Sequence, residues 1–226
     1  KPGYNKRVKE ICEENDVLFV FDEVVTGFRV GKGGAQEYFG IEADLTMLGK
    51  IIGHEYPSSG ALGGKEEIMS GLVSSAAAGA EGENVFTAGT LAGTNVTCAA
   101  CVKTIQELKR TSAMEKAAET ADKLVEGLND LFDRMDLPFF AYNYKSIIQL
   151  RLSGFYTVDL TKPDALQEVL MRRKNGKNYN LMLALENVIT LQAIRAYTTL
   201  AHAEDESKIV ERTLNAFENV CKKIKR

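Results

Sequence analysis

The first strong hydrophobic pattern in the chain is an unbroken apolar run at residues 17–21, which ends on the acidic pair Asp22 and Glu23. Short runs of β-branched and aromatic residues are typical of strands in parallel sheets, where both faces are covered. We therefore predict a strand here that is buried on both faces. Apolar positions 8, 11 and 12 repeat at helical spacing just before it and predict a short helix that ends near Asn15.

A second apolar stretch leads to the lysine at position 50. Leu45, Met47 and Leu48 predict another strand, and Gly49 and Lys50 follow it directly. Ligands of open α/β sheets bind at the carboxyl ends of strands, so both strand ends are expected to carry chemistry. A lysine among apolar neighbours can lose its hydration, which lowers its pKa and makes it a nucleophile toward carbonyl groups.

Asp22 and Lys50 together match the needs of pyridoxal phosphate. That cofactor requires a carboxylate to keep its pyridine nitrogen protonated and an amine to hold its aldehyde. Each residue also has a simpler interpretation, because Asp22 can cap a nearby loop and Lys50 can be a solvated surface lysine. An apolar run followed by Asp-Glu also fits the Walker B strand of a nucleotidase. The G-x-x-x-x-G-K-[ST] loop of that class does not occur in the chain, and Lys50 would have no role in it.

The segment 86–95, FTAGTLAGTN, is a second candidate for ligand binding. Glycines allow close approach of the backbone, and a hydroxyl with backbone N–H groups at the start of a helix suits an oxyanion. The alternative is that Thr94 or Asn95 caps this helix without any ligand.

The second half of the chain has the pattern of a small α+β domain. Positions 117, 121, 124, 128, 131 and 132 recur at helical spacing. The pattern predicts helices at 96–108, 114–135, 162–173 and 204–225, strands at 139–142, 146–152 and 188–191, and a polar loop at 174–180. We place the domain boundary between residues 110 and 111.

Composition and charge limit the class of protein. With 45% hydrophobic residues, 26% charged residues and a net charge of −3, the chain is typical of a soluble globular protein without a nucleic-acid partner. No apolar run approaches the roughly 18 residues that span a membrane, and no signal-peptide pattern is present. The four scattered cysteines suit free thiols in the cytoplasm, and Cys98 and Cys101 favour helix packing. His54 and His202 lack ligand spacing, so no metal site is expected.

Three stretches together resemble the central signature of the class III aminotransferases. They are FDEVVTGFRVGKGGAQEYFGIEADLTMLGKIIG at 21–53, GALGGKEEIM at 60–69 and FTAGTLAGTN at 86–95. Within that family, GGAQEYFG and AGTLAG bring the chain closest to the glutamate-1-semialdehyde 2,1-aminomutases. The resemblance covers residues 4–110 and implies an α/β fold. Residues 1–110 would be the C-terminal part of the large, aspartate aminotransferase-like cofactor domain, and residues 111–226 a small α+β domain.

The resemblance implies amino-group transfer on a small amino acid or amino-ketone, with pyridoxal 5'-phosphate as cofactor. It implies that Lys50 forms the Schiff base and then moves the proton. Asp22 would pair with the pyridine nitrogen and Val24 would pack on the ring. Thr90, beside Gly89, would reach the cofactor phosphate of the neighbouring subunit, which implies a homodimer with shared active sites.

The sequence departs from the family pattern in three places. HEYPSS at 54–59 replaces further glycines and a Leu-Pro, Gly-Thr-Asn at 93–95 replaces Gly-Asn-Pro, and Ile194 stands where aminomutases usually carry a glutamate. His54 is either a substrate group or a solvated loop residue. Arg195 either binds a substrate carboxylate or is an ordinary surface residue. The substrate therefore stays open.

The resemblance also implies that half of a typical member lies upstream of the first residue. That half would bring the loop that grips the cofactor phosphate and the aromatic residue that stacks on its ring. One alternative is therefore a catalytically silent fragment, or a half-enzyme that needs a separate N-terminal partner.

Overall fold

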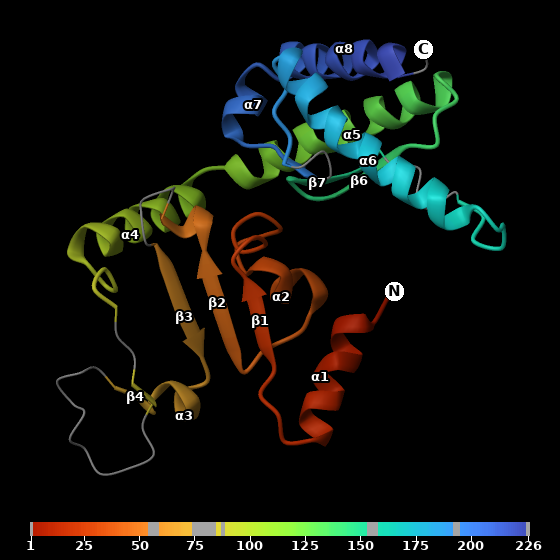
Figure 1. Ribbon diagram of the computed structural model, residues 1–226. Helices are drawn as coiled ribbons and strands as arrows, with labels where there is room; N and C mark the ends of the chain where they lie inside the picture. The colour runs from red at the N-terminus through yellow and green to blue at the C-terminus, as the bar shows by residue number, and fades with distance from the viewer. Residues whose placement is uncertain are drawn as a thin grey trace. The chain divides into compact units, whose positions relative to one another are not determined.

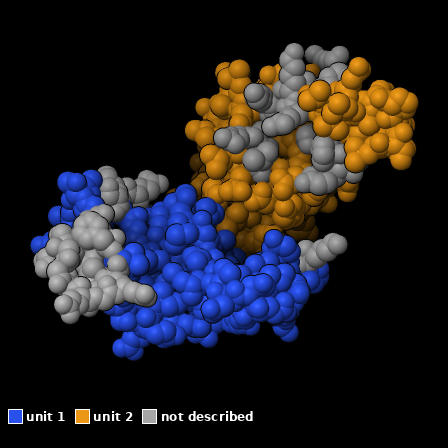
Figure 2. All heavy atoms as spheres, turned by 60° about the horizontal axis from the view of Figure 1, so that its bottom comes forward, with its two compact units in different colours: residues 1–112 blue, residues 113–226 orange. Residues whose placement is uncertain are grey.

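The computed structural model describes residues 2–53, 59–73, 85–86, 89–152, 158–191 and 195–224, with the backbone alone for 86, 171–177 and 224. The chain divides into two compact units, residues 1–112 and 113–226, shown in blue and orange in Figure 2. Each unit has its own sheet and is described by itself. No helix within the described ranges is both long and apolar enough to cross a membrane.

The first unit is built on a three-stranded sheet of order β1-β2-β3 (Figure 1). β1 and β2 run parallel and are joined through a helix, as parallel neighbours require, while β3 pairs antiparallel with β2. A sheet that contains a helix-connected pair of parallel strands confirms the predicted α/β class. In chain order the elements are α1 (Tyr4–Glu14), β1 (Val20–Glu23), α2 (Gly34–Phe39), β2 (Leu45–Gly49) and β3 (Gly60–Gly64).

Strand β1 is less buried than its sequence suggests. Exposure alternates along it and the residues just before it: Leu18 is 52% exposed and Val20 43%, whereas Phe19 is 8% and Glu23 1% exposed. The prediction of a strand buried on both faces is therefore wrong for one face. The covered face carries Phe19 and Phe21, whose rings meet edge to face with centroids 5.5 Å apart. Among the described residues, nothing covers the opposite face to the same extent.

Asp44 links the two outer strands of this sheet. Its Oδ2 accepts the N–H of Phe19 at 2.7 Å, and its Oδ1 lies 2.6 Å from Nζ of Lys65. The hydrogen bond from Lys65, followed by that from Phe19, holds the pKa of Asp44 below its usual range. One carboxylate thus links the chain entering β1 to the chain leaving β3.

The other elements of the first unit follow β2 and β3. Helix α4 contacts the short helix η1 and begins at Thr94, whose side chain accepts the N–H of Thr97 at 3.4 Å. The capping alternative is therefore confirmed for Thr94. These elements are η1 (Lys50–Gly53), α3 (Glu66–Met69), β4 (Leu72–Val73), β5 (Val85–Phe86), which pairs parallel with β4, and α4 (Asn95–Arg110).

The second unit is an antiparallel sheet of order β6-β7-β8 packed against helices. Its core includes Leu128 and Phe132 from α5, Ile148 and Leu150 from β7, and Phe217 from α8. The predicted helices at 114–135 and 204–225 and strands at 139–142 and 146–152 are present within a few residues. The elements are α5 (Ala113–Arg134), β6 (Phe140–Tyr144), β7 (Ile147–Arg151), α6 (Ala165–Leu185), β8 (Arg195–Tyr197), α7 (Leu200–Glu204) and α8 (Glu206–Ile224).

Helix α6 corrects two predictions. The polar segment 174–180 lies inside this helix and is not a loop. Its C-terminal part buries Tyr179 and Leu183, which are 6% and 0% exposed, so tertiary packing outweighs the weak helix propensity of the Asn- and Gly-containing segment. The predicted strand at 188–191 is also wrong, because only Leu191 forms a β-bridge, to Arg195.

Candidate functional site

The parallel register brings Asp22 and Lys50 to the same edge of the sheet. Asp22 lies opposite Met47, and Lys50 follows three positions further along the neighbouring strand. Because the two strands run in the same direction, both residues leave the sheet at its carboxyl end. The first unit thus gathers a carboxylate and an amine where ligands of parallel sheets bind.

Asp22 is exposed, and its Oδ1 accepts the N–H of Val24 at 3.0 Å. This local hydrogen bond turns the chain at the end of β1 and orients the carboxylate. It is the loop-capping role that was the simpler interpretation of Asp22, and it leaves the other carboxylate oxygen available to a ligand.

Lys50 is exposed, although Ile52 two positions on is buried. Its backbone has φ 49°, the left-handed conformation that costs a non-glycine residue about 1–2 kcal/mol. That turn ends β2 and begins η1, so the apolar residues after it point inward while the lysine faces water. The amine keeps its hydration within the described part of the chain.

Val24 and Gly49 bring the two strand ends into close contact. A Cβ added at Gly49 would lie 3.2 Å from Cγ1 of Val24, which is tighter than nearly all real contacts. Glycine therefore lets Val24 pack directly against the backbone beside Lys50. The side chain proposed to touch a cofactor ring thus contacts the backbone next to the proposed reactive amine.

Glu23 points to the other face of the sheet and is 1% exposed. Its carboxylate accepts the N–H groups of Ala35 and Gln36, each at 2.9 Å, and the hydroxyl of Thr26. Hydrogen bonds to a charged acceptor are about twice as strong as neutral ones. The carboxylate therefore anchors the first turn of α2 to the end of β1.

Gly34 makes this anchor possible. It has φ 67°, and a Cβ there would lie 2.6 Å from both carboxylate oxygens of Glu23. The sequence analysis did not identify Gly34 as a contact residue. The only available signal was the glycine pair at positions 33 and 34.

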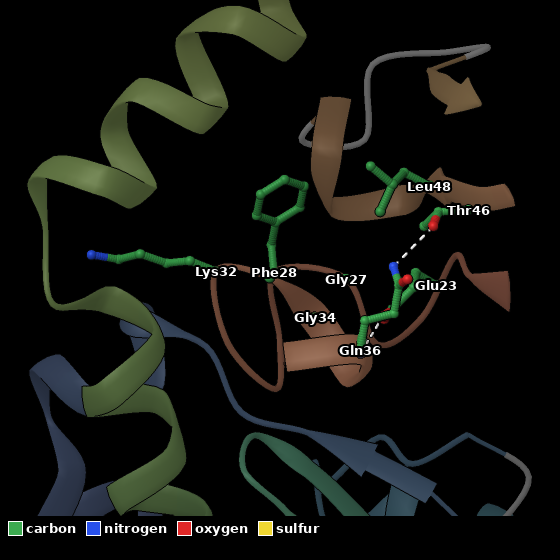
Figure 3. A pocket seen from close by; sticks show the side chains of 9 residues that line it. Glu23, Gly27, Phe28, Lys32, Gly34, Gln36, Thr46 and Leu48 are labelled. Atoms are coloured by element: carbon green, nitrogen blue, oxygen red, sulfur yellow. Dashed lines mark hydrogen bonds between the residues drawn. The ribbon is translucent and has the colours of Figure 1, made fainter. Parts of the chain in front are cut away.

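A small cavity of about 120 Å³ lies on this covered side (Figure 3). The amide of Gln36 points across it and donates to Oγ1 of Thr46 at 2.9 Å, while Lys32 extends away from that pair. Its lining includes Glu23 but not Asp22, Val24 or Lys50. Strand alternation places Asp22 on the opposite face, so this cavity is not the predicted cofactor site.

Gly89 and Thr90 lie in an exposed turn before α4. The carbonyl of Gly89 accepts the N–H of Ala92 at 3.0 Å, and Thr94 ends the turn as the helix cap. Both residues belong to the first unit, as do Asp22 and Lys50. Their exposure leaves the hydroxyl and the backbone accessible to a ligand or a second subunit.

The remaining two candidates lie elsewhere. His54 falls outside the described residues. Arg195 begins β8 in the second unit, where its Nη1 donates to the hydroxyl of Tyr197 at 3.4 Å. Its Nε is buried and has no hydrogen-bond partner in the part of the chain that the structure describes. A buried donor of this kind is costly unless an acceptor is supplied, so both interpretations of Arg195 stay open.

Residues 1–177 match the family model for class III aminotransferases. The chain belongs to the class III aminotransferase family. This membership confirms the prediction made from the three motifs, and with it the prediction of a pyridoxal-phosphate enzyme family. It leaves the nucleotidase interpretation without support.

The curated relatives carry the more specific name that the motifs suggested. A glutamate-1-semialdehyde 2,1-aminomutase from Legionella pneumophila (strain Paris) is 46% identical over 141 residues, which are 62% of this chain and 31% of that protein. The same-named protein of Methanosarcina acetivorans is 33% identical over 216 residues, 96% of this chain and 47% of that protein. The chain therefore spans about half the length of this relative.

Solved structures show the same fold at lower identity. An omega-transaminase from Sphaerobacter thermophilus superposes with a TM-score of 0.78 over 98% of this chain and 48% of that chain, at 23% identity. At this identity the likeness supports the fold alone. This chain again covers about half of the neighbour, as it does of the Methanosarcina relative.

Proposed function

We propose that this chain carries the lysine-bearing part of a pyridoxal-phosphate enzyme that transfers an amino group on a small amino acid or amino-ketone. The observation that supports the proposal is the shared carboxyl edge of β1 and β2, where Asp22 pairs with Met47 and Lys50 follows three positions further along the neighbouring strand. The names of the curated relatives favour an aminomutase of the glutamate-1-semialdehyde type.

The residues at this edge fit the cofactor. Nζ of Lys50 is an accessible primary amine that would hold the cofactor's aldehyde and later move a proton as base and then acid. The carboxylate of Asp22 would keep a proton on the pyridine nitrogen, and Val24 would contact the ring. The bound cofactor supplies an electron sink for the carbanion at the substrate carbon.

We further propose a homodimer in which the turn at Gly89 and Thr90 serves the neighbouring subunit's cofactor phosphate. The exposure of both residues supports this role. A hydroxyl and backbone N–H groups next to a long helix's N-terminus suit a phosphate dianion.

The second candidate is a chain that is silent until a complementary half joins it. Two observations favour it: the match covers 47% of the Methanosarcina relative, and Lys50 is exposed rather than desolvated. Amines used for Schiff-base chemistry are usually activated by desolvation or by a neighbouring cation.

Borohydride trapping tests both candidates. The chain is incubated with pyridoxal 5'-phosphate, reduced and digested, and the labelled peptide is identified by mass spectrometry. Label should concentrate on Lys50 and disappear in Lys50→Ala, while Lys32→Ala, which removes another exposed lysine of the same unit, should leave it unchanged. Asp22→Asn should weaken the visible absorbance of the bound cofactor.

Label spread evenly over the surface lysines would contradict the first candidate. If site-specific label appears only after the complementary half of a relative is added, the second candidate is supported. Failure of Lys50 to be labelled under either condition would refute both.

A further inference from the structure

Helix α6 carries four exposed leucines along one side. Leu166 is 71% exposed, Leu170 57%, Leu181 65% and Leu185 74%. The helix continues without a break from the first to the last of them, and at 3.6 residues per turn they fall within about 100° of its circumference. We call these four side chains the leucine stripe. Single exposed leucines are ordinary, but a row of them on one side of a helix marks an interaction surface.

The other side of α6 is already covered. Tyr179 and Leu183 are buried in the core of the second unit and lie roughly opposite the leucine stripe on the helix. The end of α6 is held against α8, because the carboxylate of Glu186 accepts hydrogen bonds from Asn219 and Lys223, each at 3.0 Å. Within the described residues, the second unit therefore packs without using the leucine stripe.

The spacing of the leucine stripe is symmetric. Leu166 and Leu170 are about one turn apart, as are Leu181 and Leu185, and the two pairs are equally far from the point between residues 175 and 176. In a two-fold interface between identical chains, residue i meets residue j wherever j meets i. Two antiparallel α6 helices with their two-fold axis at this point satisfy the rule, since Leu166 faces the partner's Leu185 and Leu170 faces the partner's Leu181.

We propose that the leucine stripe binds the leucine stripe of a second copy of this chain, as two antiparallel α6 helices related by a two-fold axis. Each copy would cover the exposed leucines of the other and remove apolar surface from water on both sides. This interface uses the second unit alone. It is separate from the turn at Gly89 and Thr90, and it does not depend on the proposed function.

The charge of α6 gives this pairing a recognisable salt dependence. Residues 165–185 include four basic residues and one acidic residue, so two copies of the helix repel each other. Salt screens repulsion between exposed charges, and self-association should therefore tighten as sodium chloride rises from about 50 to 500 mM. An acidic protein or an anionic membrane bound to the same helix would show the opposite, because salt weakens attraction between unlike charges. The direction of the salt dependence thus distinguishes the occupants.

Sedimentation velocity at about 1–100 μM measures the self-association. Leu170→Lys puts a charge into the apolar contact and should weaken the association about tenfold or more. Leu170→Met keeps an apolar side chain and should associate within about twofold of wild type. Ile11→Lys introduces the same charge at an exposed residue of α1 in the first unit and should associate as wild type does. Because both positions are exposed, the melting curves of the three variants should match that of wild type.

A complementary pair of variants tests the antiparallel register. Leu166→Lys and Leu185→Glu should each associate weakly alone, because each places a charge opposite a leucine at both ends of the pair. Mixed in equal amounts they should associate again, since the new lysine then faces the new glutamate at one end and two leucines meet at the other. A mixture of Leu166→Lys with Leu170→Glu is the matched control. It brings no opposite charges together in this register and should stay weak.

The proposal predicts loss of association in Leu170→Lys, recovery in the first mixture alone, and tightening with salt. It is overturned if wild type and Leu170→Lys have the same mass at every concentration up to about 100 μM, if Ile11→Lys weakens association equally, or if both mixtures recover alike. The remaining check uses vesicles of equal parts phosphatidylcholine and phosphatidylglycerol. Wild type that binds them through the leucine stripe, with salt weakening the binding and no self-association, would identify a membrane surface as the occupant and also overturn the proposal.

Discussion

The contact between Gly34 and Glu23 can be tested with a matched pair of glycine substitutions. Gly34 and Gly40 have nearly the same left-handed backbone, with φ 67° and 63°. A methyl group at Gly40 would meet nothing within 4 Å, whereas one at Gly34 would lie 2.6 Å from the carboxylate oxygens of Glu23. Alanine substitutions at the two sites should therefore cause nearly equal backbone strain, but only the substitution at Gly34 creates a steric clash.

The expected magnitudes follow from these distances. The left-handed backbone alone costs alanine about 1–2 kcal/mol at either site. At position 34, Glu23 must also move, which weakens its bonds to Ala35 and Gln36, each worth about 1.5–3 kcal/mol. Gly34→Ala should thus lose about 3–6 kcal/mol, against a typical total stability of roughly 5–15 kcal/mol.

Urea unfolding followed by circular dichroism gives the comparison. Because the two units can unfold separately, amide exchange of residues 17–40 should accompany it. Exchange at Ala35 and Gln36 should accelerate in Gly34→Ala and stay near wild type in Gly40→Ala. In a Glu23→Ala background the clash is absent, so the added cost of Gly34→Ala should fall to that of Gly40→Ala. Equal losses for the two single variants would refute the argument.

Three further predictions concern single side chains. Glu23→Gln weakens the buried hydrogen bonds from Ala35 and Gln36, so the free energy of unfolding should fall by about 1–3 kcal/mol in a urea titration. Glu37→Gln weakens a single exposed hydrogen bond, from the N–H of Gly33, and should cost less than about 1 kcal/mol in the same titration. The pKa of Asp44 is lowered on folding, so its stabilising effect is present above its unfolded pKa of about 3.9 and is lost as pH falls through the folded value. Melting temperatures measured downward from pH 5 should therefore fall less in Asp44→Asn than in wild type. Asn129→Ala removes two hydrogen bonds to the buried backbone of Ala141, and urea unfolding should show a loss of about 1–3 kcal/mol.

The sequence could predict the two parallel strands but not which face of them is covered. Residues 17–21 are all apolar, so their periodicity shows that both faces can be buried. Whether they are buried depends on a second layer, which for Leu18 and Val20 is lacking in the described residues. An apolar run shows that both faces of a strand can be buried, but the residues that bury them come from other parts of the fold.

Contacts between residues distant in sequence account for the other differences between the predictions and the structure. Glu23 stands out in the sequence only as an acidic residue at a strand end, because its partners Ala35 and Gln36 lie 12 and 13 residues away and carry no signal of their own. Segment 174–180 looked like a loop because Asn and Gly disfavour helices locally. The burial of Tyr179 and Leu183 against the second unit's core decides otherwise.

The candidate site shows the same division between local pattern and environment. Strand patterns and the family motifs predict that Asp22 and Lys50 leave the sheet at one edge, and the parallel register agrees. Their environment could not be predicted, because a reactive lysine needs a dry surrounding that a single strand end cannot provide. In this chain both groups are exposed, and Asp22 shares its face with Met47 and Leu62. The exposure of Asp22 and that of Met47 and Leu62 thus have one physical cause, because no second layer covers this face within the described residues.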